Sequence, residues 1–220
     1  MRFAGGAAIL TALVWLAALA LPRGLADLRA FEARMLFQSW ETARRAPTAE
    51  EWTLAHDRLL EARALDPRQP NYLEDIARLD TLRASWPKAG EAAAREHLRQ
   101  ALGLQRQAAR LRPGSPYTWS NIALLKARLG ETDREFEAAL RHAALLGPWE
   151  PDIQITLADI GFRHWASLAP ETREAIRANA GRALRWQGAK MLELARRTGR
   201  LEVLCAAPGI SRSPQSRACI

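Results

Sequence analysis

The chain has 220 residues and a formal net charge of +8, which comes from 32 basic and 24 acidic side chains. Aromatic residues make up only 7% of it and 43 residues are Ala, a bias that excludes a β-sandwich or barrel and predicts an all-α fold. The excess charge is local, because residues 24–162 hold 19 basic and 20 acidic side chains whereas residues 163–220 hold 11 basic and 4 acidic. This excess of basic charge is not accompanied by zinc-finger spacing or by a clear helix-turn-helix pattern, so we expect no nucleic-acid partner.

The N-terminus carries a membrane signal. Residues 3–21 are 19 consecutive residues without a charge, and a helix needs about 20 apolar residues to cross a bilayer. Residues 1–23 are therefore either a membrane anchor or a cleaved signal peptide, with Ala18-Leu19-Ala20 as the cleavage motif. The apolar run exceeds the usual signal-peptide core of about 7–15 residues, which favours the anchor. Both interpretations place residues 24–220 outside the cytoplasm.

Residues 24–47 are predicted to form an N-terminal capping helix. Apolar residues recur there at helical spacing, and we expect them to form the face that packs on the rest of the fold. These residues are Leu25, Leu28, Phe31, Met35, Leu36 and Trp40.

A 15-residue frame recurs three times in the middle of the chain. It reads LDPRQPNYLEDIARL at 65–79, LRPGSPYTWSNIALL at 111–125 and LGPWEPDIQITLADI at 146–160. The first Pro of each copy ends a helix because it has no backbone N–H to donate. The second Pro falls in the first turn of the next helix, where that N–H is not needed. Each copy therefore predicts a tight turn between two helices.

With its flanking helices, this frame resembles the tetratricopeptide repeat. The best-fitting unit carries the resemblance through Trp119, Ile122, Ala123, Gly130, Phe136, Leu140, Ala143 and Pro148. The resemblance implies a short α-solenoid of helical hairpins over residues 48–169, with an insertion near 83–96 that contains a loop at Pro87. First-helix positions of such repeats line a concave groove, which here would hold a protein partner. These positions are Asn71, Glu74, Arg78, Tyr117, Ser120, Leu124, Arg128, Asp152 and Phe162.

Residues 170–204 are predicted to form a C-terminal capping helix, which opens with acidic residues after Pro170 and closes at Gly199. Five arginines fall roughly along one side of it, and such a face can meet anionic lipid headgroups or an acidic polymer. The ordinary alternative is a solvated face. The five are Arg173, Arg177, Arg185, Arg196 and Arg200.

Residues 205–220 form a tail that holds both cysteines of the chain, Cys205 and Cys219. An exported chain with an even number of cysteines permits a disulfide. The bridge would stabilise the fold by about 3 kcal/mol, because it closes a loop and so restricts the unfolded chain. The alternative is a pair of unpaired thiols on a frayed tail.

No recognisable motif for catalysis or metal binding occurs. There is no nucleophile elbow, P-loop or dinucleotide-binding fingerprint. The four histidines also lack metal-ligand spacing, and they are His56, His97, His142 and His164. We therefore expect no catalytic residue, no metal, no cofactor and no enzymatic activity.

Four further segments of the C-terminal half are RPGSPYTWSNIALLKARLG, LRHAALLGPWEPDIQITLADIG, LAPETREAI and GRLEVLC. Through them, the stretch from 111 to 200 resembles the VpsP-type proteins of bacterial exopolysaccharide gene clusters. The resemblance implies a single-pass protein of the bacterial inner membrane, with most of the chain in the periplasm, that assists polysaccharide assembly or export. We therefore expect a scaffold or adaptor that binds proteins of such a system through its groove.

The alternative function is direct binding of an acidic polysaccharide by tryptophans and the basic C-terminal helix. Sugar-binding surfaces often combine an aromatic platform with nearby arginines. Trp149, in a turn, and Trp86, in the insertion, are expected to be exposed. Trp119 and Trp165 are instead expected to fill the core, where a large apolar side chain contributes most.

Overall fold

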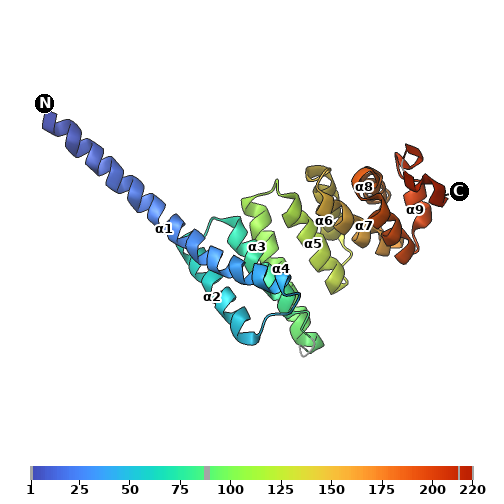
Figure 1. Cartoon of the computed structure of the whole chain (residues 1–220), viewed down its shortest axis with the longest axis horizontal. Helices are drawn as coiled ribbons and strands as arrows, with labels where there is room; N and C mark the ends of the chain where they lie inside the picture. Colours follow the sequence, from blue (N-terminus) through green and yellow to red (C-terminus); the bar gives the residue numbers. More distant parts are fainter. Residues whose placement is uncertain (1, 87–89, 213, 220) are drawn as a thin grey trace. The chain divides into compact units, whose positions relative to one another are not determined.

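The computed structural model describes residues 2–86, 90–212 and 214–219, and every regular element within them is helical (Figure 1). The all-α class is therefore confirmed for this part of the chain. The predicted loop residue Pro87 lies outside it. The chain divides into two compact units, Met1–Ala94 and Arg95–Ile220, and the boundary falls within the predicted insertion near 83–96.

The first unit contains α1 (Arg2–Thr42), α2 (Ala49–Leu65) and α3 (Pro70–Arg83). Figure 1 shows α1 as one continuous helix that begins near the N-terminus. By length and composition it is the one helix in the described residues that is able to cross a membrane. One helix, which contains Pro22, therefore joins the apolar N-terminal segment to the body of this unit.

The body of the first unit forms where α1 packs on α2. α1 buries Ala26, Ala30 and Ala33, followed by Phe37 and Trp40, and this set recurs at intervals of three and four residues. Small side chains let the two backbones approach closely, so α1 presents its alanine-rich face to α2. The predicted packing face is wrong for four of its six residues, because the larger side chains point to solvent. The exposed four are Leu25, Leu28, Phe31 and Met35.

The second unit begins within α4 (Glu91–Leu111). Its α-helices are α5 (Pro116–Leu129), α6 (Arg134–Leu146), α7 (Pro151–Arg163), α8 (Pro170–Arg197) and α9 (Leu201–Cys205). Short 3-10 helices lie at Trp165–Ser167, Ile210–Arg212 and Pro214–Cys219.

The three proline frames form the turns that the sequence predicts. α2, α4 and α6 end at the leucine that opens each frame. α3, α5 and α7 begin at the second proline, which occupies the first turn of its helix. The spacing of the prolines thus determines where these six helices end and begin.

Polar side chains also define helix starts, because the N–H groups of a first turn have no partner within the helix. At α2 the Thr48 hydroxyl accepts from the Glu51 N–H at 3.2 Å, and the Glu51 carboxylate accepts from the Thr48 N–H at 2.9 Å. Arg45 adds two hydrogen bonds to this carboxylate, of 2.6 and 2.7 Å. The Arg45 bonds, followed by the Thr48 N–H, lower the pKa of Glu51 to about 2.

A buried lysine stabilises the α5–α6 hairpin. The side chain of Lys126 is only 1% exposed, and its ammonium donates to Glu131, Asp133 and Glu135 at 3.0, 2.9 and 3.0 Å. Burial alone lowers the pKa of this ammonium, but hydrogen bonds to the three carboxylates outweigh burial and raise it. Lys126 occupies the buried face of α5, four residues after Ile122 and three before Leu129, where an apolar residue is the usual choice.

Candidate functional sites

The nine predicted groove residues are divided between the two units. Asn71, Glu74 and Arg78 belong to the first unit and the other six to the second. Ser120 and Phe162 are only 3% and 0% exposed, so the prediction that they line a groove is wrong. Both lie on the buried sides of their helices. The repeat resemblance did not predict which side of each helix is buried.

The other groove residues of the second unit remain at or near the surface. Tyr117 is exposed, and its hydroxyl donates to the Glu150 carboxylate at 2.6 Å. Asp152 and Arg128 are exposed and Leu124 is half-buried. These four residues are therefore at least partly accessible.

Of the groove residues, Arg78 does line a pocket. This aromatic pocket, of about 310 Å³, lies in the first unit between the end of α1, the following loop and the end of α3. The guanidinium of Arg78 lies 4.8 Å from the centre of the Phe37 ring and also pairs with Glu41. The lining residues are Phe37, Trp40, Glu41, Arg44, Arg45, Ala46, Pro47, Arg78, Leu82, Ser85 and Trp86.

Two features distinguish the aromatic pocket from a plain apolar hollow. The indole N–H groups of Trp40 and Trp86 are buried and have no acceptor among the described residues. Arg44 holds a left-handed backbone with φ of 49°, a conformation that usually selects glycine after a helix. Trp86 is half-buried here, contrary to the prediction that it is exposed.

The predicted basic face of α8 does not act as one surface. Arg173 donates to the carbonyls of Trp165 and Ala166 at 3.0 and 2.8 Å, and Arg177 pairs with Glu174 at 2.5 Å. Arg200 donates to the Phe162 carbonyl, which ties the end of α8 to α7. Arg196 is exposed. Arg173 and Arg200 thus hold segments of the second unit together, whereas Arg177 pairs within α8.

The fifth, Arg185, lines a second pocket together with an arginine that the sequence prediction missed, Arg182. This basic pocket has a volume of about 430 Å³ and lies where α8 meets the turn before α7 and the tail. Trp149 lines it and is 60% exposed, as predicted. The lining residues are Trp149, Ala178, Gly181, Arg182, Arg185, Pro208, Gly209 and Ser211.

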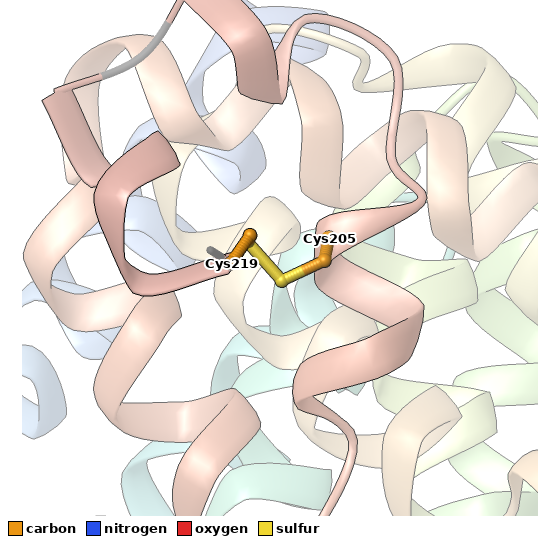
Figure 2. Close-up of a disulfide and its surroundings, with 2 residues drawn as sticks. All are labelled: Cys205 and Cys219. Atoms are coloured by element: carbon orange, nitrogen blue, oxygen red, sulfur yellow. A yellow bond between two sulfur atoms is a disulfide. The ribbon is translucent and has the colours of Figure 1, made fainter.

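The tail forms one wall of the basic pocket. At Gly181 a Cβ would lie 2.3 Å from the Pro208 carbonyl oxygen, so only glycine lets the tail pack this closely on α8. Cys205 and Cys219 are joined by a disulfide with Cα atoms 5.6 Å apart, which closes the loop that contains Pro208 (Figure 2). The wall therefore depends both on a glycine and on a covalent closure.

The electrostatics of the basic pocket favour an anion. Among its lining residues there is no Asp or Glu. Within the described residues Arg182 donates to the Pro148 carbonyl at 3.1 Å and forms no ion pair, and burial lowers the pKa of its guanidinium. A partly desolvated cation that lacks a carboxylate partner gains more from an incoming anion than a hydrated one does.

Trp119 and Trp165 were expected to fill the core, and both are instead half-buried. The indole N–H of Trp119 donates to the Pro113 carbonyl at 2.7 Å. Trp165 lies near the guanidinium groups of Arg173 and Arg177, 5.9 and 5.7 Å from its ring centre. Both rings therefore lie at the edge of the second unit, beside turns, and not at its centre.

Neither pocket is lined by a cluster of metal-ligating side chains. In the described residues no group of three or more His, Cys, Asp or Glu side chains lies close enough together to hold an ion. No protein-family model matches the chain, and no curated protein matches it either.

Proposed function

We propose that the chain is a membrane-anchored adaptor of the bacterial cell envelope, which binds proteins of an exopolysaccharide synthesis or export system. The observation that carries this proposal is the continuity of α1, whose apolar N-terminal part and alanine-rich packing face belong to one helix. From Leu21 to Trp40 such a helix extends about 30 Å. An adaptor with this construction holds its binding surface at a fixed height above the bilayer.

The proposed orientation places the body in the periplasm. The Cys205–Cys219 disulfide supports it, because such bonds persist in oxidising compartments and are rare in the cytosol. The proline-bounded hairpins support a tetratricopeptide-like architecture, in which short helical pairs provide binding surfaces for protein segments. The aromatic pocket is the proposed contact site in the first unit, because aromatic residues and arginine are the side chains that most often dominate protein interfaces.

Site-specific photocrosslinking in the native host tests the adaptor. A photoreactive residue replaces Leu82, which lines the aromatic pocket, and a matched one replaces Leu60, an exposed residue of α2 that does not line it. The Leu82 position should give an adduct with a protein of polysaccharide synthesis or export, identified by mass spectrometry, and the Leu60 position should not. Equal adducts from both positions, or adducts only with unrelated proteins, would refute the proposal.

The basic pocket favours a second candidate function, direct binding of an acidic polysaccharide. Arg182 and Arg185 offer guanidinium donors that can bind a carboxylate in a bidentate manner. Trp149 offers an exposed apolar ring beside them. A sugar ring that carries a carboxylate combines the two chemistries, since its C–H face is apolar and its acid group is anionic.

A titration of the full-length chain with a polyuronate oligosaccharide, at low and high salt, tests this candidate. Arg185→Gln should weaken binding roughly 10- to 100-fold, because a hydrogen bond to a charged group contributes about 1.5–3 kcal/mol. Arg196→Gln is the matched control, since Arg196 is an exposed arginine of the same helix that does not line the pocket. Absence of binding at both salt concentrations, or equal losses in the two variants, would exclude the pocket as the site.

A further inference from the structure

α1 has a second apolar face, opposite the one that packs on α2. Leu28 lies two residues from both Ala26 and Ala30, which places it about 160° around the helix from these buried residues. Large apolar side chains on this outer face are open to solvent in the described structure. Their exposed fractions are 65% for Val14, 64% for Leu21, 52% for Leu28, 56% for Phe31 and 48% for Met35.

The outer face follows a heptad repeat, and we call its members the outer stripe. Their spacing alternates between three and four residues, in the order Val14, Ala17, Leu21, Gly24, Leu28, Phe31 and Met35. An apolar repeat that averages 3.5 residues keeps one seam of a helix facing a partner helix as the two supercoil. The pattern therefore indicates a helix that pairs with another helix over about three heptads.

The outer stripe contains small residues near the point where the apolar segment of α1 ends. Ala17 and Gly24 are its two small residues, and no heavy atom lies within 4 Å of the position that a Cβ on Gly24 would take. Small residues at such positions let two helix backbones approach closely, which is the usual basis of helix pairing in a bilayer. The larger Leu28, Phe31 and Met35 continue the seam into the body.

Two charged side chains that flank the stripe form ion pairs within the chain. On one side Glu32 pairs with Arg58 of α2 at 2.7 Å, and on the other Arg34 pairs with Asp75 of α3 at 2.8 Å. A third, Asp27, accepts a hydrogen bond from the Tyr72 hydroxyl at 2.7 Å. A second helix that covers the stripe therefore meets Glu32 and Arg34 already paired, which lowers the penalty for covering them. These ion pairs also fix the side chains that border the seam.

We propose that the outer stripe pairs with the same stripe of a second copy of this chain, as a parallel and in-register coiled coil. In the proposed anchored arrangement, two copies enter the bilayer in the same direction and at the same depth. Each stripe residue then faces its own counterpart, as in parallel coiled coils. An identical chain supplies a heptad of matching length and phase, with the same small residues at the bilayer boundary.

Cysteine crosslinking of the full-length chain in native membranes tests the pairing. Both native cysteines are bonded to each other, so an introduced cysteine is the free thiol. Leu28→Cys should form a disulfide-linked dimer under mild oxidation. Arg23→Cys is the matched control, because Arg23 is exposed on α1 but lies about 140° around the helix from Leu28. Equal dimer yields from the two variants, or linkage of Leu28→Cys to a different protein, would overturn the proposal.

A second measurement separates loss of pairing from misfolding. The mass of the detergent-solubilised chain, measured by light scattering, should correspond to two copies for the wild type. It should fall to one copy for the double variant Leu28→Glu and Phe31→Glu, with unchanged helical circular dichroism, because both side chains point to solvent. Leu60→Glu, an exposed position of α2, should keep the dimer. A dimer that survives the double variant would also overturn the proposal.

Discussion

Replacement of Lys126 by Met provides a direct test of how the second unit is stabilised. Met keeps most of the length and apolar volume of the lysine stem but removes the buried ammonium. Glu131, Asp133 and Glu135 then lose a common cation that lies within 3.0 Å of each. Arg106 still pairs with Glu135 at 2.5 Å, so this carboxylate keeps one partner.

The magnitude follows from how much water the three carboxylates retain. Removing one partner of a fully buried ion pair costs about 3–5 kcal/mol, whereas exposed pairs contribute about 0–1 kcal/mol. The ammonium is buried, but the carboxylate side chains remain 40%, 57% and 35% exposed. We therefore expect Lys126→Met to lower the free energy of unfolding by about 2–4 kcal/mol, between the two limits.

The stability difference between wild type and Lys126→Met should depend on pH. The Lys126 ammonium is the main cause that lowers the pKa of Asp133, while Arg106 and then Lys126 lower the pKa of Glu135. Carboxylates with lowered pKa values stabilise the fold above their unfolded pKa of about 4, and this contribution is lost as the pH falls through the folded pKa. The difference between wild type and variant should therefore be full at neutral pH and shrink below about pH 4.

Thermal unfolding of the full-length chain in detergent, followed by circular dichroism, measures this difference. At neutral pH the melting temperature of Lys126→Met should fall by roughly 5–15 °C. Lys190→Met is the control, because Lys190 is exposed on α8. The reasoning fails if Lys126→Met and the wild type have the same melting temperature at neutral pH. It also fails if the difference between their melting temperatures is as large in acid as at neutral pH.

Three further predictions concern the tail and the start of α2. Gly181→Ala should destabilise the chain by about 1–3 kcal/mol, because the added Cβ overlaps a carbonyl of the tail. Gly103→Ala meets nothing within 4 Å and should be neutral or stabilising by up to about 1 kcal/mol, so equal melting temperatures of the two variants would contradict the packing argument. Replacing both tail cysteines by Ser should cost about 3 kcal/mol in thermal unfolding, and an unchanged melting temperature would show that the tail adds no stability. Arg45→Gln should raise the pKa of Glu51 from about 2 toward its ordinary value in an NMR titration, and a pKa that stays near 2 would mean that the Thr48 N–H alone is sufficient.

Local chemistry made the helix boundaries predictable. Pro70, Pro116 and Pro151 each open a helix because proline fits a first turn and little else in a helix. Gly199 follows the end of α8 with φ of 65°, as expected for a glycine after a helix. These signals act over a few residues, so the sequence alone is sufficient to find them.

Long-range packing made the sites harder to predict. The sequence pattern offers α1 two apolar faces, and only the approach of α2 selects the alanine-rich one and leaves Phe31 exposed. Arg182 lies beside a tail segment that is 26 residues further along the chain at Pro208. The burial of Lys126 likewise depends on acids beyond its own helix. One clue was available, since Gly181 interrupts a helix that needs no glycine for its own geometry.

The disulfide determines when the loop that forms one wall of the basic pocket becomes covalently closed. Pro208, Gly209 and Ser211 form one wall of that pocket and lie between the two bonded cysteines. A chain that is made in a reducing cytoplasm and then exported has this loop open during synthesis and closed only after oxidation. In the proposed periplasmic orientation, the covalent closure of this wall would therefore follow translocation.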